Sequence, residues 1–68
     1  MTVKIQSETG VEIAKYNNAK FRHNEETATA AIWNDHGQAE LEWVQVVQEN
    51  IYEADLLPDG LPVKIIIE

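Results

Sequence analysis

Hydrophobic and polar residues alternate in two short runs near the start of the chain. Val3 and Ile5 each have polar neighbours, and Val11 and Ile13 repeat the pattern after the turn-forming residues 7–10. Strict alternation is typical of a strand with one buried face, and a turn ending in glycine suits the connection between two such strands. The pattern therefore predicts a β-hairpin over about residues 2–7 and 10–16.

The next two segments predict further short strands. Residues 20–23 can form a third strand after an asparagine turn. Residues 27–33 fit a strand with Ala28, Ala30 and Ile32 on one face. A helix capped by Asn24 is the competing interpretation of this region. Its β-branched threonines and its lack of a clear apolar stripe favour the strand.

Segment 39–55 decides the predicted fold class. At 100° per residue, its apolar residues fall within an arc of roughly 100°, and its glutamates lie on a separate stripe. The apolar residues are Trp43, Val44, Val47, Ile51 and Ala54, and the glutamates are Glu42, Glu49 and Glu53. This pattern predicts one long amphipathic helix. The valines of residues 40–47 favour a strand instead, so an all-β meander stays open as the alternative.

Residues 63–67 predict a last strand. Three consecutive isoleucines are typical of an inner strand covered on both faces, or of an edge strand covered by a partner. The expected fold is therefore α+β, in one small domain over residues 1–68. It consists of a small antiparallel sheet, a meander plus the C-terminal strand, with the long helix at about 39–55 packed across it. The opposite sheet face would be open to a second protomer.

Charge and composition narrow the class of protein. The chain has 68 residues, a hydrophobic fraction of 44% and no cysteine, which fits a small globular domain without disulfides. Its formal charge of −7 is uneven: residues 1–37 carry four basic and five acidic groups, and residues 38–68 carry one and seven. The longest apolar run is far shorter than the ~20 residues that span a bilayer. We expect a cytoplasmic protein without membrane contact.

No catalytic or cofactor motif is present. His23 and His36 flank the strand predicted at 27–33, which would separate them by roughly 23 Å, too far for one metal ion. Ser7 is the only serine and does not lie in a Gly-x-Ser-x-Gly motif, and no glycine-rich phosphate loop occurs. The sequence predicts that the protein is not an enzyme and uses neither a cofactor nor a metal.

The acidic second half supplies the leading hypothesis for function. Glu42, Glu49 and Glu53 would form the exposed stripe of the predicted helix, with Asp55 beyond it. Acidic groups gathered on one face attract a basic surface and select against acidic ones. The sequence therefore predicts a small interaction module of the inhibitor or accessory-protein type, which binds a basic protein surface through these four residues.

Two alternatives belong to other classes. Residues 15–23 interleave basic and aromatic side chains, as single-stranded nucleic acid binding requires. These residues are Lys15, Tyr16, Lys20, Phe21 and Arg22. The net charge of −7 argues against this interpretation, because phosphates would be repelled. The third hypothesis is a structural homo-oligomer that associates through the open sheet face and the strand at 63–67.

Overall fold

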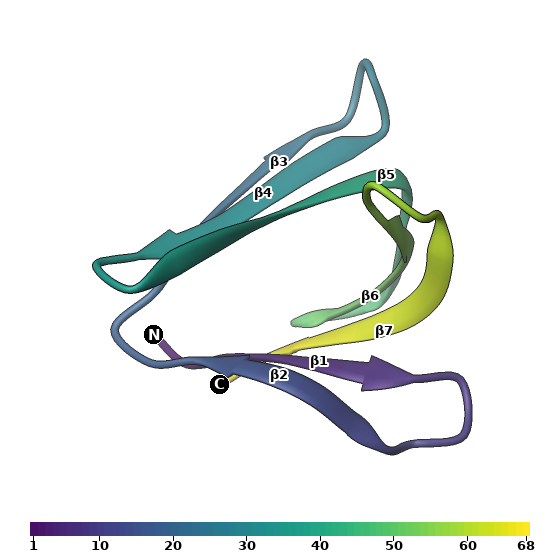
Figure 1. Ribbon diagram of the computed structural model, residues 1–68. Helices are drawn as coiled ribbons and strands as arrows, with labels where there is room; N and C mark the ends of the chain where they lie inside the picture. Colours follow the sequence, from purple (N-terminus) through teal and green to yellow (C-terminus); the bar gives the residue numbers. More distant parts are fainter.

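The computed structural model describes residues 1–68 and contains seven β-strands and no helix (Figure 1). The strands are β1 (Val3–Ser7), β2 (Glu12–Tyr16), β3 (Lys20–Asn24), β4 (Thr29–Asn34), β5 (Gly37–Gln48), β6 (Ile51–Leu56) and β7 (Leu61–Ile67). They form one antiparallel sheet in the order β2-β1-β7-β6-β5-β4-β3. Because no helix forms, no helical segment is available to cross a bilayer.

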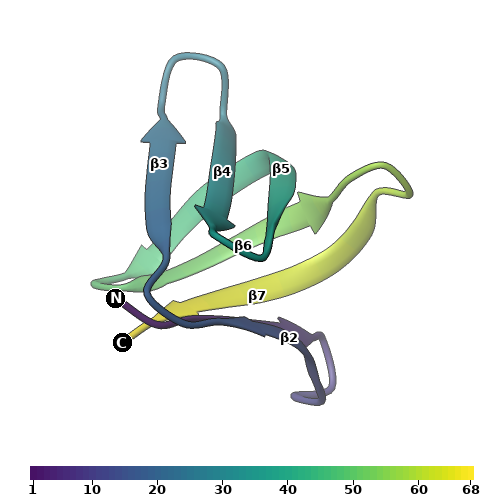
Figure 2. The ribbon, with the colours of Figure 1, turned by 60° about the vertical axis from the view of Figure 1, so that its left-hand side comes forward.

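The sheet curls around its own hydrophobic core. β3 to β7 form a meander that bends through β5, β6 and β7, and the β1–β2 hairpin is attached because β1 pairs with β7 (Figures 1 and 2). The inner face carries the side chains with the least exposure, which are Val3, Ile5, Ile32, Leu41 and Ile65. One curled layer thus supplies both sides of the core.

An aromatic cluster spans the interior of the curl. Phe21 on β3 contacts Tyr52 on β6, with ring centroids 4.9 Å apart, although β4 and β5 lie between these strands in the sheet. The His23 ring meets Tyr52 edge-on at 5.4 Å, and its buried Nε2 has no hydrogen-bond partner. Contacts across the interior therefore hold β3 toward β6 where no strand pairing does so.

Most of the predicted strands are confirmed. β1 and β2 form the expected hairpin, with Ile5 opposite Ala14. The predicted strand at 27–33 is β4, and Ala30 and Ile32 are buried as expected, whereas Ala28 lies in the turn before the strand with a φ of +56°. β7 is an inner strand between β1 and β6, so it is not an edge available to a partner. The local pattern of residues was sufficient to place these strands, although β1 pairs irregularly with β2 between Ile5 and Gln6, and Val11 and Ile13 are exposed rather than buried.

The helix predicted for 39–55 is wrong. This segment forms β5 and β6, so the fold is all-β rather than α+β, as the alternative interpretation allowed. Leu41 and Val44 are both buried although they lie three positions apart, because the pairing of β5 with β6 is irregular between Glu42 and Gln45. A bulge of this kind inserts an extra residue and gives a strand the spacing of a helix face.

Of the inward positions expected for the helix, Val44 and Ala54 are buried, but the others are not. Trp43 is 70% exposed and Val47 is 50% exposed. Ile51 is half-buried and lies opposite Ile66 of β7, after the turn formed by Glu49 and Asn50. Because a bulge and a turn interrupt the segment, its apolar residues divide between the two faces of a hairpin.

Candidate functional site

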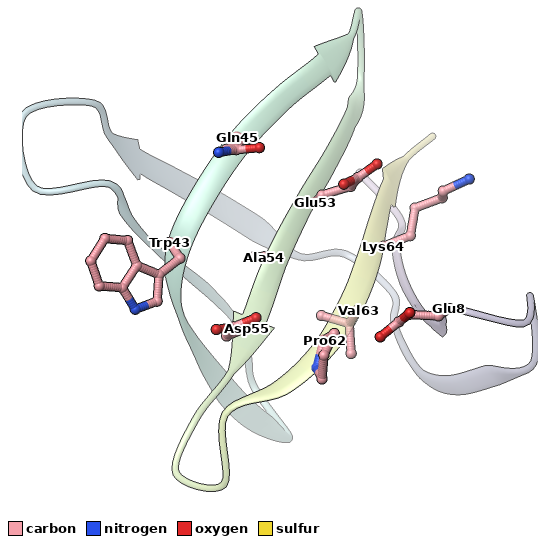
Figure 3. Close-up of a pocket in the computed structure, with 9 residues that line it drawn as sticks. All are labelled: Glu8, Trp43, Gln45, Glu53, Ala54, Asp55, Pro62, Val63 and Lys64. Atoms are coloured by element: carbon pink, nitrogen blue, oxygen red, sulfur yellow. The ribbon is translucent and has the colours of Figure 1, made fainter.

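Trp43 is presented to solvent by the bulge in β5. Its backbone has φ of +54°, a left-handed conformation that disfavours side chains other than glycine by about 1–2 kcal/mol. The next residue, Val44, is buried, and its N–H donates to the carbonyl oxygen of Ala28 at 2.8 Å. Val44 thus anchors the bulge to the β3–β4 connection, and the ring of Trp43 extends from the outer side of β5 (Figure 3).

Three carboxylates lie beside this ring on the same side of the sheet. Glu42 on β5 is directly opposite Asp55 on β6, and Glu53 lies opposite Gln45. The molecule's single ion pair joins Lys4 and Glu68 at 3.2 Å, so these three carboxylates have no basic group within ion-pair distance. Like charges directly opposite each other in a sheet are destabilising.

We call this surface the β5–β6 outer face; it consists of Glu42, Trp43, Gln45, Glu53 and Asp55. A shallow depression of about 510 Å³ lies on it and extends over β7 (Figure 3). Its lining residues are Glu8, Trp43, Gln45, Glu53, Ala54, Asp55, Pro62, Val63 and Lys64. Lys64 is opposite Glu53 in register but does not form an ion pair with it. The face therefore combines an exposed aromatic ring with unpaired negative charge.

The structure brings three of the four predicted partner-binding acids together. Glu42, Glu53 and Asp55 share the outer face, whereas Glu49 lies in the turn between β5 and β6. Sequence reasoning missed Trp43, because both the helix and a regular strand over 40–47 assign it away from these acids. No signal in the sequence marks the bulge that moves Trp43 to the outer face.

The predicted basic and aromatic segment is divided by the fold. Phe21 packs inward against Tyr52, whereas Lys20 and Arg22 on the same strand are exposed on the other face. Tyr16 packs against the core from β2.

Lys15 is exposed on β2, whereas the rings of Tyr16 and Phe21 both pack against the core. The rings and the cations of residues 15–23 therefore do not form one stacking surface, and the geometry does not favour nucleic acid binding.

Comparison with known proteins does not assign a function. No family model, curated protein or solved structure matches this chain. The function must therefore be inferred from the geometry and the charge of the molecule itself.

Proposed function

We propose that this protein is a non-enzymatic binding module that docks onto a basic protein surface through the β5–β6 outer face, as an inhibitor or accessory protein does. The observation that carries this proposal is Trp43, which is 70% exposed in a left-handed backbone conformation beside the unpaired carboxylates of Glu42 and Asp55. Neither feature stabilises the folded chain. Local strain and exposed aromatic rings are concentrated at functional surfaces.

A basic partner satisfies both parts of this surface. Guanidinium and ammonium groups bind over the face of a tryptophan ring and also form hydrogen-bonded pairs with carboxylates. An arginine placed between Trp43 and Asp55 would relieve the repulsion between Asp55 and Glu42. Tryptophan and arginine are also the residues that most often dominate binding energy at protein interfaces.

The charge distribution supports attraction of such a partner from a distance. Residues 38–68 carry seven of the twelve acidic groups and one of the five basic groups. An electrostatic potential of one sign raises the rate of encounter with an oppositely charged surface, and salt screens this attraction. Binding through this face should therefore weaken as ionic strength rises. A cytoplasmic location is part of the same proposal and can be tested with a fluorescent fusion.

Octa-arginine is a defined probe for this face. Its binding is measured from the fluorescence of Trp43 in a Trp33→Phe background, which removes the other tryptophan. We expect Glu42→Lys with Asp55→Lys to weaken binding by about tenfold or more, because attraction becomes repulsion at the contact. For the protein without these substitutions, the affinity for octa-arginine should decrease as the salt concentration is raised from about 20 mM to about 300 mM.

The matched control for this reversal is Glu25→Lys with Glu26→Lys, in the exposed turn between β3 and β4. Both double variants change the net charge equally, so they separate the outer face from the total charge. If the two variants lose the same affinity, the β5–β6 outer face is not the binding surface.

Replacing Trp43 with glycine tests the ring separately from the charge. We expect Trp43→Gly to reduce octa-arginine binding, now followed by calorimetry. The free energy of unfolding should stay within about 1 kcal/mol of the unaltered value, because glycine adopts positive φ without a Cβ clash. Asn50→Gly is the control, since Asn50 also has positive φ, 63°, but lies in the turn. Full octa-arginine affinity in Trp43→Gly would contradict a role for the ring.

A further inference from the structure

The second half of β5 has no hydrogen-bonded neighbour on one side. β5 runs from Gly37 to Gln48, but β4 pairs with it only as far as Leu41. Beyond that point a single bond, from the Val44 N–H to the Ala28 carbonyl, reaches it from the β4 side. β6 occupies the opposite side throughout. The backbone of residues 45–48 therefore has an unoccupied edge on the β4 side, with regular pairing to β6 at Gln45 and Val46 and a second irregularity between Val46 and Gln48.

The side chains along this edge are not of the kinds that usually prevent strand addition, although the pairing of β5 with β6 is irregular on both sides of Gln45 and Val46. Residues 45–48 read Gln-Val-Val-Gln, all exposed, with Val46 at 58% and Val47 at 50%. The free edge strands β2 and β3 carry charged side chains, including Lys15 and Lys20, which discourage the approach of another strand. Residues 45–48 contain no charge, proline or glycine, so their edge can accept a strand.

We propose that an extended segment of the partner, with alternating basic and apolar residues, adds to the sheet along residues 45–48 of β5. This inference rests on the proposed function and specifies how the partner binds. Side chains of an added strand alternate between the two faces of the sheet. One set would lie beside Trp43 on the outer face, and the other beside Val46, which is opposite the inward-facing Tyr52.

Charge complementarity selects a basic segment over a second copy of this chain. A second copy brings another net charge of −7, whereas a basic segment lies near Glu42 on the same strand and Glu53 on the next strand. Two strand spacings place Glu53, which is opposite Gln45, about 10 Å from the added strand. That distance is about the Debye length at 0.1 M salt, so the attraction is still felt there.

Amide hydrogen exchange at residues 45–48 tests this inference directly. The probe is the blocked peptide Arg-Val-Arg-Val-Arg-Val-Arg, added to isotope-labelled protein. At ten times its Kd, we expect exchange of the amides that face the free edge to slow by about tenfold, because only about a tenth of the protein stays unbound. The control peptide has proline in place of each valine. This control peptide has the same charge but has no backbone N–H to donate at those positions. It should therefore not slow amide exchange at residues 45–48.

A protein variant gives an independent measurement. Val47→Lys places a charge on the edge and should weaken binding of the alternating peptide by about tenfold. Val11→Lys introduces the same charge at another exposed valine, outside β5, and should leave the affinity nearly unchanged. Equal losses in the two variants would contradict strand addition at this edge.

The remaining outcomes separate this inference from the proposed function. If the alternating peptide binds without slowing exchange at residues 45–48, strand addition is wrong and the proposed function stands. If neither this peptide nor octa-arginine binds, both are wrong. If exchange slows with protein concentration alone and the mass rises toward twice 7.7 kDa, a second copy occupies the edge and the inference is overturned.

Discussion

Ile65→Ala is expected to remove about 2–5 kcal/mol from the free energy of unfolding, the largest effect of any substitution considered for this chain. Ile65 is 0% exposed and pairs with Ile5 on one side and Tyr52 on the other. A domain of this length has roughly 3–10 kcal/mol of stability in total. The loss should therefore leave the variant partly or wholly unfolded, as urea denaturation followed by circular dichroism would show.

Ile66→Ala is the matched control for Ile65→Ala. Ile66 is adjacent, has the same side chain and lies in the same strand, but it is on the outer side and only half-buried. Its truncation removes less buried area and leaves no enclosed cavity, so the loss should be well below that of Ile65→Ala. Equal losses at the two positions would mean that the inner face of β7 is not the centre of the core.

Asn34→Ala is expected to lower the free energy of unfolding by about 1–3 kcal/mol, because one side chain serves three backbone groups. Its Oδ1 accepts from the N–H groups of His36, at 2.8 Å, and Gly37, at 3.0 Å, which shapes the turn between β4 and β5. Its Nδ2 donates to the carbonyl of Asn17 at 2.9 Å. This last bond joins that turn to the connection between β2 and β3. Thermal unfolding measures the loss.

Two further variants separate these contributions. Asn34→Asp keeps the acceptor for the turn but loses the donor to Asn17, so it should recover part of the stability lost in Asn34→Ala. Asn24→Ala removes an equivalent acceptor from the β3–β4 turn, where Oδ1 accepts from Glu26 and Thr27. It has no bond outside its own turn and should cost less than Asn34→Ala. Equal costs would show that the link to Asn17 contributes nothing.

The features that define the outer face and the β5 edge have one structural origin. The irregular pairing between Glu42 and Gln45 turns Trp43 outward and buries Val44. The regular pairing of β4 with β5 has already ended at Leu41, before this bulge. Residues 45–48 consequently continue with β6 alone. Binding of the partner's basic groups and addition of its backbone are therefore expected at adjacent places on one strand.

The candidate site could be predicted only in part. The accumulation of acids in the second half is a property of the amino-acid sequence, and Glu42, Glu53 and Asp55 lie close together in the structure. Their arrangement is not that of a helix stripe, because Glu42 and Asp55 are neighbours across two strands. Glu49 is separated from them in the turn. Pairing between strands depends on register, which local periodicity does not contain.

The sequence by itself determined the short regular strands, the turns and the uneven charge, because alternation, turn residues and acidic side chains are local properties. Only the tertiary structure decided that residues 39–55 form a bulged hairpin, with Trp43 outside and Val44 inside. The physical reason is that one extra residue in a strand shifts the side-chain alternation by one position and imitates a helical period. Whether a bulge forms there depends on the pairing of β5 with β6 and on the contact between Val44 and Ala28.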